Sequence, residues 1–210
     1  MSKLIDLSHS ITDDMPVHPY DKKVNLNQNK YLQKDGYNHF RLETGMHAGT
    51  HIDSPLHLTD HEKTINEFSL EKFMGKGCVL DVSGESIINY KKRYSKLIKE
   101  NVDIVLLYTG YSIIYGSESY FNSHPVVSEE LAEFFIKKKI KMLGVDLPSP
   151  DYYPFKIHKK LLKEEIFIIE NLKNLSKLLD VNNFEVMSFP LKVKADASIT
   201  RVVAKIYDSK

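Results

Sequence analysis

Residues 46–57 read MHAGTHIDSPLH and place three histidines, an aspartate and two hydroxyl side chains within twelve positions. Few of these side chains suit a hydrophobic core. Apolar and polar residues alternate through the preceding segment, 38–46, and this pattern predicts a half-buried strand. Gly45 and Gly49 argue against a helix through the stretch, and Gly49 lets the backbone bend sharply. We therefore expect a strand that runs into a tight turn carrying polar chemistry.

The spacing of His47, His51 and Asp53 suits a metal ion, because Zn²⁺ and Mn²⁺ take nitrogen and carboxylate ligands. A metal-free, histidine-rich loop explains His47 and His51 equally well, since short motifs also match by chance. Asp53 and His57 favour the metal, because four such groups gain little from one another without one. His57 stays open between a further ligand and a general acid or base, since imidazole titrates near neutrality.

Other candidate residues lie beside this stretch or far from it. Ser54 next to Asp53 permits a serine hydrolase, but no Gly-x-Ser-x-Gly elbow surrounds it. Glu170 ends the apolar run IFII, and a carboxylate at the end of a buried strand needs a partner or a metal. His158 begins an amphipathic segment upstream of it. From the residues alone, a salt bridge to lysine is the simpler explanation of Glu170. The remaining histidines are interpreted as surface or hydrogen-bonded side chains: His9, His18, His39, His61 and His124.

Composition restricts the class of protein. The chain of 210 residues has a net charge of +1, which indicates neither a nucleic-acid nor a membrane partner. No apolar run approaches the roughly 20 residues that a membrane span needs, and residues 1–14 lack the apolar core of a signal peptide. Cys78, the single cysteine, excludes internal disulfides and is predicted to lie in a buried strand. We expect one domain, 1–210, located in the cytoplasm.

Strands and helices alternate along the chain, which predicts an α/β or α+β fold with a mixed sheet. Ser128 suits a helix N-cap, with acidic residues after it and lysines at the far end. The predicted strands are 4–11, 38–46, 76–83, 103–109 and 166–170, with a strand followed by a turn at 141–148 and two more strands within 188–208. The predicted helices are 128–140 and 158–165, with a helical turn at 171–175.

Residues 47–57 resemble HxGTHxDxPxH, the signature of the bacterial kynurenine formamidase family, also called the cyclase family of metal-dependent hydrolases. Other segments resemble further parts of the same family, so the likeness extends over nearly the whole chain: DLSHSITDDMPVHP, LLYTGY, GVDLPSPD, HKKLLKEEIFIIENLKNL and FPLKVKADASITRVVA. The resemblance implies a swivelling β/β/α fold with flanking helices, assembled as a homodimer or homotetramer.

The resemblance also assigns roles to single residues. It implies a metal centre, often with two zinc ions and in some relatives with manganese. It implies ligands at His47, His51, Asp53, His158 and Glu170, with Asp53 between the two ions. It implies that His57 is the catalytic acid or base. The implied reaction is hydrolysis of a C–N amide bond by metal-bound hydroxide, in a small molecule such as N-formylkynurenine.

One departure from the family concerns the substrate. The family's first loop carries Trp-Pro-Gly-Asp, and its tryptophan lines the substrate pocket. Here the loop reads His18-Pro19-Tyr20-Asp21, and the chain has no tryptophan. We expect His18 to stack on an aromatic substrate in its place. A cyclic amide of the isatin type and a lactone remain alternatives, as does a protein that binds a metal or small ligand without catalysis.

Overall fold

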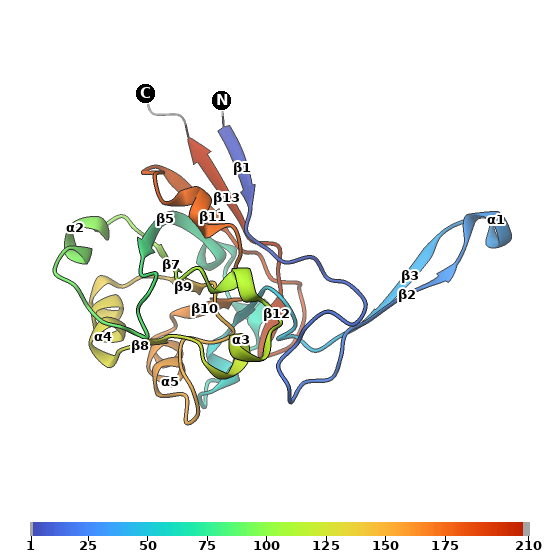
Figure 1. Ribbon diagram of the computed structural model, residues 1–210, viewed down its shortest axis with the longest axis horizontal. Helices are drawn as coiled ribbons and strands as arrows, with labels where there is room; N and C mark the ends of the chain where they lie inside the picture. Colours follow the sequence, from blue (N-terminus) through green and yellow to red (C-terminus); the bar gives the residue numbers. More distant parts are fainter. Residues whose placement is uncertain (1, 208–210) are drawn as a thin grey trace.

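A computed structural model describes residues 2–207. Its centre is a mixed sheet of nine strands that links segments from both ends of the chain (Figure 1). From edge to edge the strands are β1 (Ser2–Asp6), β13 (Val203–Tyr207), β11 (Phe184–Met187), β5 (Met74–Asp81), β7 (Ile104–Tyr108), β9 (Met142–Val145), β10 (Phe167–Glu170), β4 (His51–Asp53) and β12 (Ala197–Ile199). The predicted mixed sheet with flanking helices is confirmed.

The middle of the sheet is parallel, and its flanks are antiparallel. Strands β5, β7, β9 and β10 run parallel to one another. The sequences of β7, β9 and β10 are near-continuous apolar runs, as expected of strands buried on both faces. Strands β4 and β12 continue the sheet antiparallel at one side, and β11, β13 and β1 do so at the other. The polar side chains of β4 therefore lie at the boundary between the parallel strands and the antiparallel flank.

Two apolar layers cover the parallel strands. Leu131 and Leu161, from two helices, pack with Val105 and Leu107 on one face. On the other face, Ile104 and Leu106 share a cluster with Ile5, Phe184 and Ala204, because the antiparallel flank curls back over the sheet. Successive residues of β7 therefore pack into two different apolar cores. The resulting layers are a sheet, a second sheet layer and the helices. A β/β/α arrangement is what the family resemblance implies.

The helices are short and lie around the sheet. The predicted segment 128–140 contains a helix in which the Ser128 side chain accepts a hydrogen bond from the Leu131 amide. The predicted turn at 171–175 is displaced, since a 3₁₀ helix spans Leu175–Leu178 instead. Within residues 2–207 no helix has both the length and the apolar character that crossing a membrane requires. The α-helices are α1 (Leu32–Asp35), α2 (Tyr94–Leu97), α3 (Glu118–Asn122), α4 (Glu129–Lys138) and α5 (Lys156–Lys163).

The sequence analysis missed five strands and the short helices α1, α2 and α3. The omitted strands are β2 (Asn25–Lys30), β4, β11, β6 (Ile87–Ile88) and β8 (Val126–Val127), of which β6 and β8 form a small parallel pair. Strand β2 is almost wholly polar, so it carries no hydrophobic period to detect. Strand β11 follows a short turn and alternates over only four residues.

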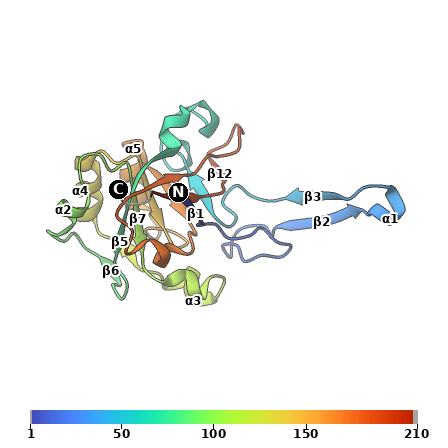
Figure 2. The ribbon, with the colours of Figure 1, turned by 90° about the horizontal axis from the view of Figure 1, so that it is seen from above.

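A hairpin arm formed by β2, α1 and β3 (His39–Glu43) extends away from the body (Figures 1 and 2). The prediction of a half-buried strand at 38–46 is wrong about burial, because every residue of β3 is exposed. Phe40 is 57% exposed and Leu42 is 42% exposed. The alternation identifies the strand correctly, but the described chain supplies no apolar surface against which it packs.

Candidate metal centre and active site

The turn between the arm and β4 gathers the polar residues of the opening stretch. Gly49 has a φ of 61°, a left-handed conformation that favours glycine. A β-carbon there would lie 2.8 Å from the Met15 methyl carbon, so the turn is also tightly packed. His47 consequently sits beside His51, with ring centroids 5.1 Å apart. The sharp bend expected at Gly49 is present.

Sheet pairing brings the distant part of the site to this turn. Strand β10 pairs with β4 so that Glu170 lies directly opposite His51. Glu170 Oε2 is 3.3 Å from His51 Nε2, and its Oε1 is 3.0 Å from His158 Nε2. His158 projects from α5, which packs beside β10. Residues separated by more than a hundred positions therefore meet at the end of the parallel block.

The five predicted ligands form two groups that share one carboxylate. His47, His51 and Asp53 converge in the first group, and Asp53, His158 and Glu170 in the second. Within each group the ligand atoms lie within 4.8 Å of one another. The groups supply imidazole nitrogens and carboxylate oxygens, a donor set that suits zinc and manganese.

Two buried atoms at the centre of the cluster test whether a cation fits. His51 Nε2 and Asp53 Oδ1 are buried and have no hydrogen-bond partner among the described residues. Leaving a buried polar atom without a partner costs about 1–3 kcal/mol. His51 Nδ1 is already engaged with the Gly49 carbonyl at 2.9 Å, which leaves Nε2 to face the cluster. A divalent cation would satisfy both orphaned atoms, so the residues fit a metal.

Charge is concentrated at this cluster. Burial alone would lower the pKa of His47, but the nearby charge of Asp53 and the hydrogen bond with Asp196 outweigh it and raise that pKa to about 11. Burial alone would raise the pKa of Asp53, but the nearby His51 and His47 hold it well below its usual range. Histidines must lose their protons to bind a metal, so an ion competes with protons here.

An outer carboxylate orients His158. Asp151 Oδ1 lies 2.6 Å from His158 Nδ1, and Asp151 Oδ2 accepts a hydrogen bond from the Ile157 amide at the start of α5. Fixing one ring nitrogen in this way directs Nε2 toward Glu170 and Asp53. Asp151 lies in the quoted segment GVDLPSPD, but the sequence analysis gave it no role. Only its position next to His158 in space reveals one.

His57 occupies a place apart from the two ligand groups. It ends the 3₁₀ helix η1 (Pro55–His57), which directly follows β4. Its ring lies 4.3 Å from that of His47, and its Nδ1 is 2.8 Å from Asp196 Oδ2. His57, His47 and Asp196 make a third cluster with metal-ligating atoms, although none of the Glu170 or His158 atoms belongs to it. Asp196 was also missed in the sequence.

Comparison with known proteins agrees with this geometry. The profile of the family named Cyclase matches residues 5–152, a segment that contains the turn, β4 and η1. The chain belongs to the Cyclase family. It is 30% identical to the kynurenine formamidase of Bacillus thuringiensis subsp. konkukian, over 97% of this chain and 98% of that one. The kynurenine formamidase of Bacillus anthracis is equally similar, with the same coverage.

Solved structures of similar fold cover essentially the whole chain. A structure described as a potential metal-dependent hydrolase with cyclase activity is 25% identical, with a TM-score of 0.78 and complete coverage of both chains. Isatin hydrolase A from Ralstonia solanacearum has a TM-score of 0.84 at 19% identity, over 98% of this chain and 92% of that one. At that identity the second likeness concerns the fold alone.

The Cyclase-family site opens into a cavity of about 770 Å³. The predicted ligands, His57 and His18 are all among the residues that line it. The His18 ring is edge-on to Phe121 at 6.0 Å and tilted toward Tyr20 at 5.4 Å. Other aromatic residues complete the wall: Tyr115, Tyr152, Tyr153, Phe155 and His124. The cavity therefore joins the cluster of predicted ligands to an aromatic wall.

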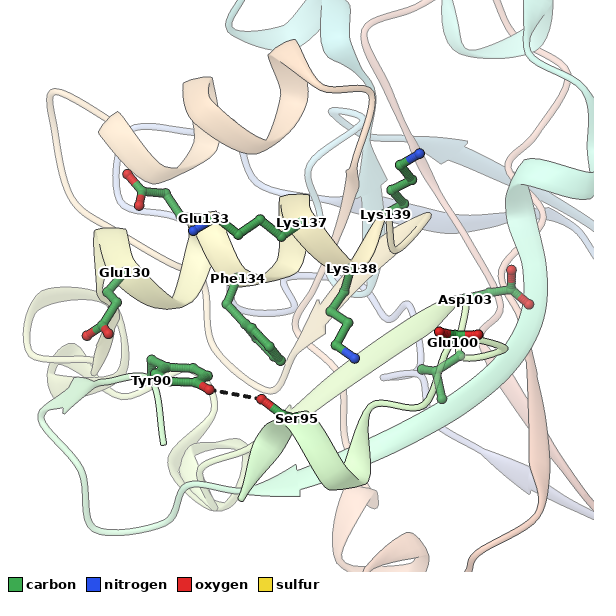
Figure 3. A pocket seen from close by; sticks show the side chains of 11 residues that line it. Tyr90, Ser95, Glu100, Asp103, Glu130, Glu133, Phe134, Lys137, Lys138 and Lys139 are labelled. Atoms are coloured by element: carbon green, nitrogen blue, oxygen red, sulfur yellow. Dashed lines mark hydrogen bonds between the residues drawn. The ribbon is translucent and has the colours of Figure 1, made fainter. Parts of the chain in front are cut away.

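A second hollow of about 900 Å³ lies against α4 and the segment around α2 (Figure 3). Lysines and acidic residues both line it, among them Lys137, Lys138, Glu130 and Glu133. None of the predicted site residues reaches it. The aromatic cavity is therefore the candidate active site.

Three further residues considered in the sequence analysis have defined positions. Ser54 is fully buried, and its hydroxyl donates to the Asp196 carbonyl at 2.7 Å, so that hydroxyl is held by the fold. His124 is hydrogen-bonded as expected, but it also stacks on Tyr152 at 4.1 Å in the cavity wall. Cys78 lies in β5 and is half-buried rather than fully buried, and burial raises the pKa of its thiol to about 11.

Proposed function

We propose that the chain is a metal-dependent hydrolase of a C–N amide bond, with an N-formyl aryl amine such as N-formylkynurenine as its substrate. The observation that carries this proposal is the pair of ligand groups that share Asp53 at the end of an aromatic cavity. The similarity to kynurenine formamidases over 97% of the chain supports the same reaction. That both parts of the site rest on one sheet supports a single domain spanning residues 1–210.

We propose His47, His51 and Asp53 as ligands of one ion, and Asp53, His158 and Glu170 as ligands of a second. Zinc is the proposed metal and manganese the alternative, because both accept this donor set. When bound, such an ion polarises a substrate carbonyl and makes water a stronger nucleophile near neutral pH. The chain's own contribution is to hold the ligands in place, through the turn at Gly49 and through the Asp151 contact with His158.

We propose His57 as the residue that moves the proton. Its Nδ1 is bound to Asp196, so Nε2 is the nitrogen left to exchange protons with groups in the cavity. In amide hydrolysis a base takes a proton from the attacking water, and the resulting acid returns it to the departing amine nitrogen. A carboxylate partner at Nδ1 suits this task, because it stabilises the imidazolium that forms between the two steps.

The aromatic enclosure supports an aromatic substrate. Aromatic pairs gain about 0.5–1.5 kcal/mol beyond the burial of their area. We propose that His18 provides one such contact, in the position where family formamidases carry tryptophan. A smaller ring at this place leaves room for a different substrate shape, so a cyclic amide of the isatin type is the second candidate.

We propose that the protein assembles as a homodimer or homotetramer through the hairpin arm. The arm carries exposed apolar residues along its length: Tyr31, Leu32, Tyr37, Phe40 and Leu42. Large exposed apolar areas on soluble proteins often mark interaction sites, and so many exposed apolar residues on one arm support this role. The arm also starts and ends near the site, since the cavity-lining residues Pro16, His18 and Asp21 precede β2 and His47 follows β3. Cytoplasmic location remains a prediction from the sequence.

A substrate panel on metal-reconstituted protein tests the function. Purified protein is stripped with chelator, reloaded with zinc or manganese, and assayed with N-formylkynurenine, N-formylaniline, isatin and an aryl lactone. We expect the fastest hydrolysis with the formamides, and none in the stripped protein. Preference for isatin would select the cyclic amide. Metal binding without hydrolysis of any compound would leave a binding protein, and activity that survives stripping but not Ser54→Ala would reverse the metal assignment.

A further inference from the structure

Asp196 lies where the proton-moving histidine and a metal-ligand histidine meet. Its Oδ2 is 2.8 Å from His57 Nδ1 and 3.1 Å from His47 Nε2. The two imidazole rings lie 4.3 Å apart, so one carboxylate oxygen serves both. The side chain comes from the segment before β12, far from both histidines in sequence.

The backbone that carries Asp196 is fixed independently of its side chain. The Ser54 amide and hydroxyl both donate to the Asp196 carbonyl, at 2.9 and 2.7 Å. The next residue, Ala197, pairs with Asp53 across β12 and β4. On the other side the Ile65 amide donates to the Ala195 carbonyl at 2.9 Å. The carboxylate therefore approaches His57 from a rigid support, and removing it leaves these backbone bonds in place.

This contact decides which nitrogen of His57 carries hydrogen. A carboxylate only accepts hydrogen bonds, so the Nδ1 facing Asp196 must be the N–H nitrogen. In the neutral ring Nε2 is then the bare nitrogen, which can accept a proton in the cavity. Without Asp196, His57 is free to adopt the opposite tautomer or to rotate, and either change removes the acceptor from the cavity. The side chain of Asp196 is thus coupled to one defined property of His57.

We propose that Asp196 is a positioning residue that holds His57 in the tautomer with hydrogen on Nδ1. Asp196 touches neither substrate nor the reacting atoms in this role and acts through His57. The inference rests on the proposed function, because the tautomer matters only if His57 accepts a proton. The competing role of the same carboxylate is support of His47 as a metal ligand, and the two roles differ in what the loss of Asp196 changes.

The test compares Asp196→Ala, His57→Ala and the double variant, all loaded with zinc. Asp196→Ala should lower kcat by about 10²-fold or more, with KM changed by less than about 3-fold and the metal content intact. In the His57→Ala background the same substitution should change kcat by less than about 3-fold, because the two residues act as one unit. Equal losses in both backgrounds, or loss of metal from Asp196→Ala, would overturn the proposal.

A spectroscopic measurement separates this proposal from the proposed function. Nitrogen-15 NMR of the zinc-loaded protein should find hydrogen on Nδ1 of His57 in the wild type and a mixture of tautomers in Asp196→Ala. That result with no amide hydrolysis would retain the positioning role and reject the function. An active wild type whose His57 tautomer is unchanged in the variant would reject the positioning role alone. Should Asp196→Ala fail to fold, Asp196→Asn, which keeps the shape and loses the charge, must lower kcat with metal retained.

Discussion

The hairpin arm is adjacent in sequence to the turn that leads into β4, but the two regions differ in how far they are buried. Strand β3 is exposed at every residue, while β4, which starts only eight positions after β3 ends, is buried at every residue. Strand β3 pairs with β2 alone in the described chain, whereas β4 is held on both edges by β10 and β12. Substitutions in the turn should therefore affect chemistry, and those in the arm should affect assembly.

The largest effect is expected from His51→Ala. Its Nε2 faces Asp53 and Glu170 without a hydrogen-bond partner in the described chain, so its loss removes a ligand central to the cluster. We expect metal content and activity to fall together to background, measured by elemental analysis and by the formamide assay. His39→Ala on the arm is the matched control and should keep both. A variant at His51 that retained metal would contradict the ligand assignment.

A smaller loss is expected from His57→Ala. His57 lies outside the groups that share Asp53, so metal content should stay at the wild-type level. Removing a general acid or base typically costs about 10²–10⁴-fold in rate, and a loss in kcat of this size is expected. Loss of metal from this variant would instead make His57 a ligand, which is the alternative that its spacing left open.

Disrupting the arm should break the assembly and leave the fold intact. Phe40→Asp with Leu42→Asp places charge on two exposed apolar positions, and exposed substitutions usually change stability by about 0.5 kcal/mol or less. We expect the mass measured by light scattering to fall to that of one chain. The two substitutions themselves should leave the melting temperature of the single chain unchanged. Ile113→Asp, which alters a residue 85% exposed on the body, is the control. If the wild type is already monomeric, the proposed role of the arm is wrong.

The smallest effect concerns His9, which stacks on Tyr115 at 3.9 Å behind the turn. Burial lowers its pKa from about 6.5 to about 4. As pH falls from 6.5 toward 4, the unfolded chain takes up this proton before the folded chain does, so stability falls. In His9→Phe, the acid-induced drop in melting temperature of chelated protein should shrink by about 2–4 °C, the shift expected for roughly 1 kcal/mol in a chain of this size. An equal drop in both proteins would show that His9 is not the group responsible.

The sequence was informative where one segment determines its own structure. Ser128 predicts the start of α4 because an N-cap is a local contact, and the apolar run of β7 predicts a buried strand. The exposure of β3 could not be predicted from its own residues, because it depends on which other segments pack against the strand. The spacing of His47, His51 and Asp53 suggested a metal site, whereas His158 and Glu170 became predicted ligands only through the family resemblance. Asp151 and Asp196 were missed because their partners are defined by packing, and Asp196 lies 139 positions from His57.

The pairing of Glu170 with His51 has a consequence for how the protein folds. Side chains alternate across a strand, so His51 and Asp53 face the site while Ile52 enters the apolar core behind it. A slip of β4 by one residue would drive an imidazole and a carboxylate into that core and turn an isoleucine toward the ligands. Packing of the apolar core therefore selects the strand register that aligns the predicted ligands, whether or not an ion is bound. Metal uptake would accordingly serve as an assay for correctly aligned strands in variants of the sheet.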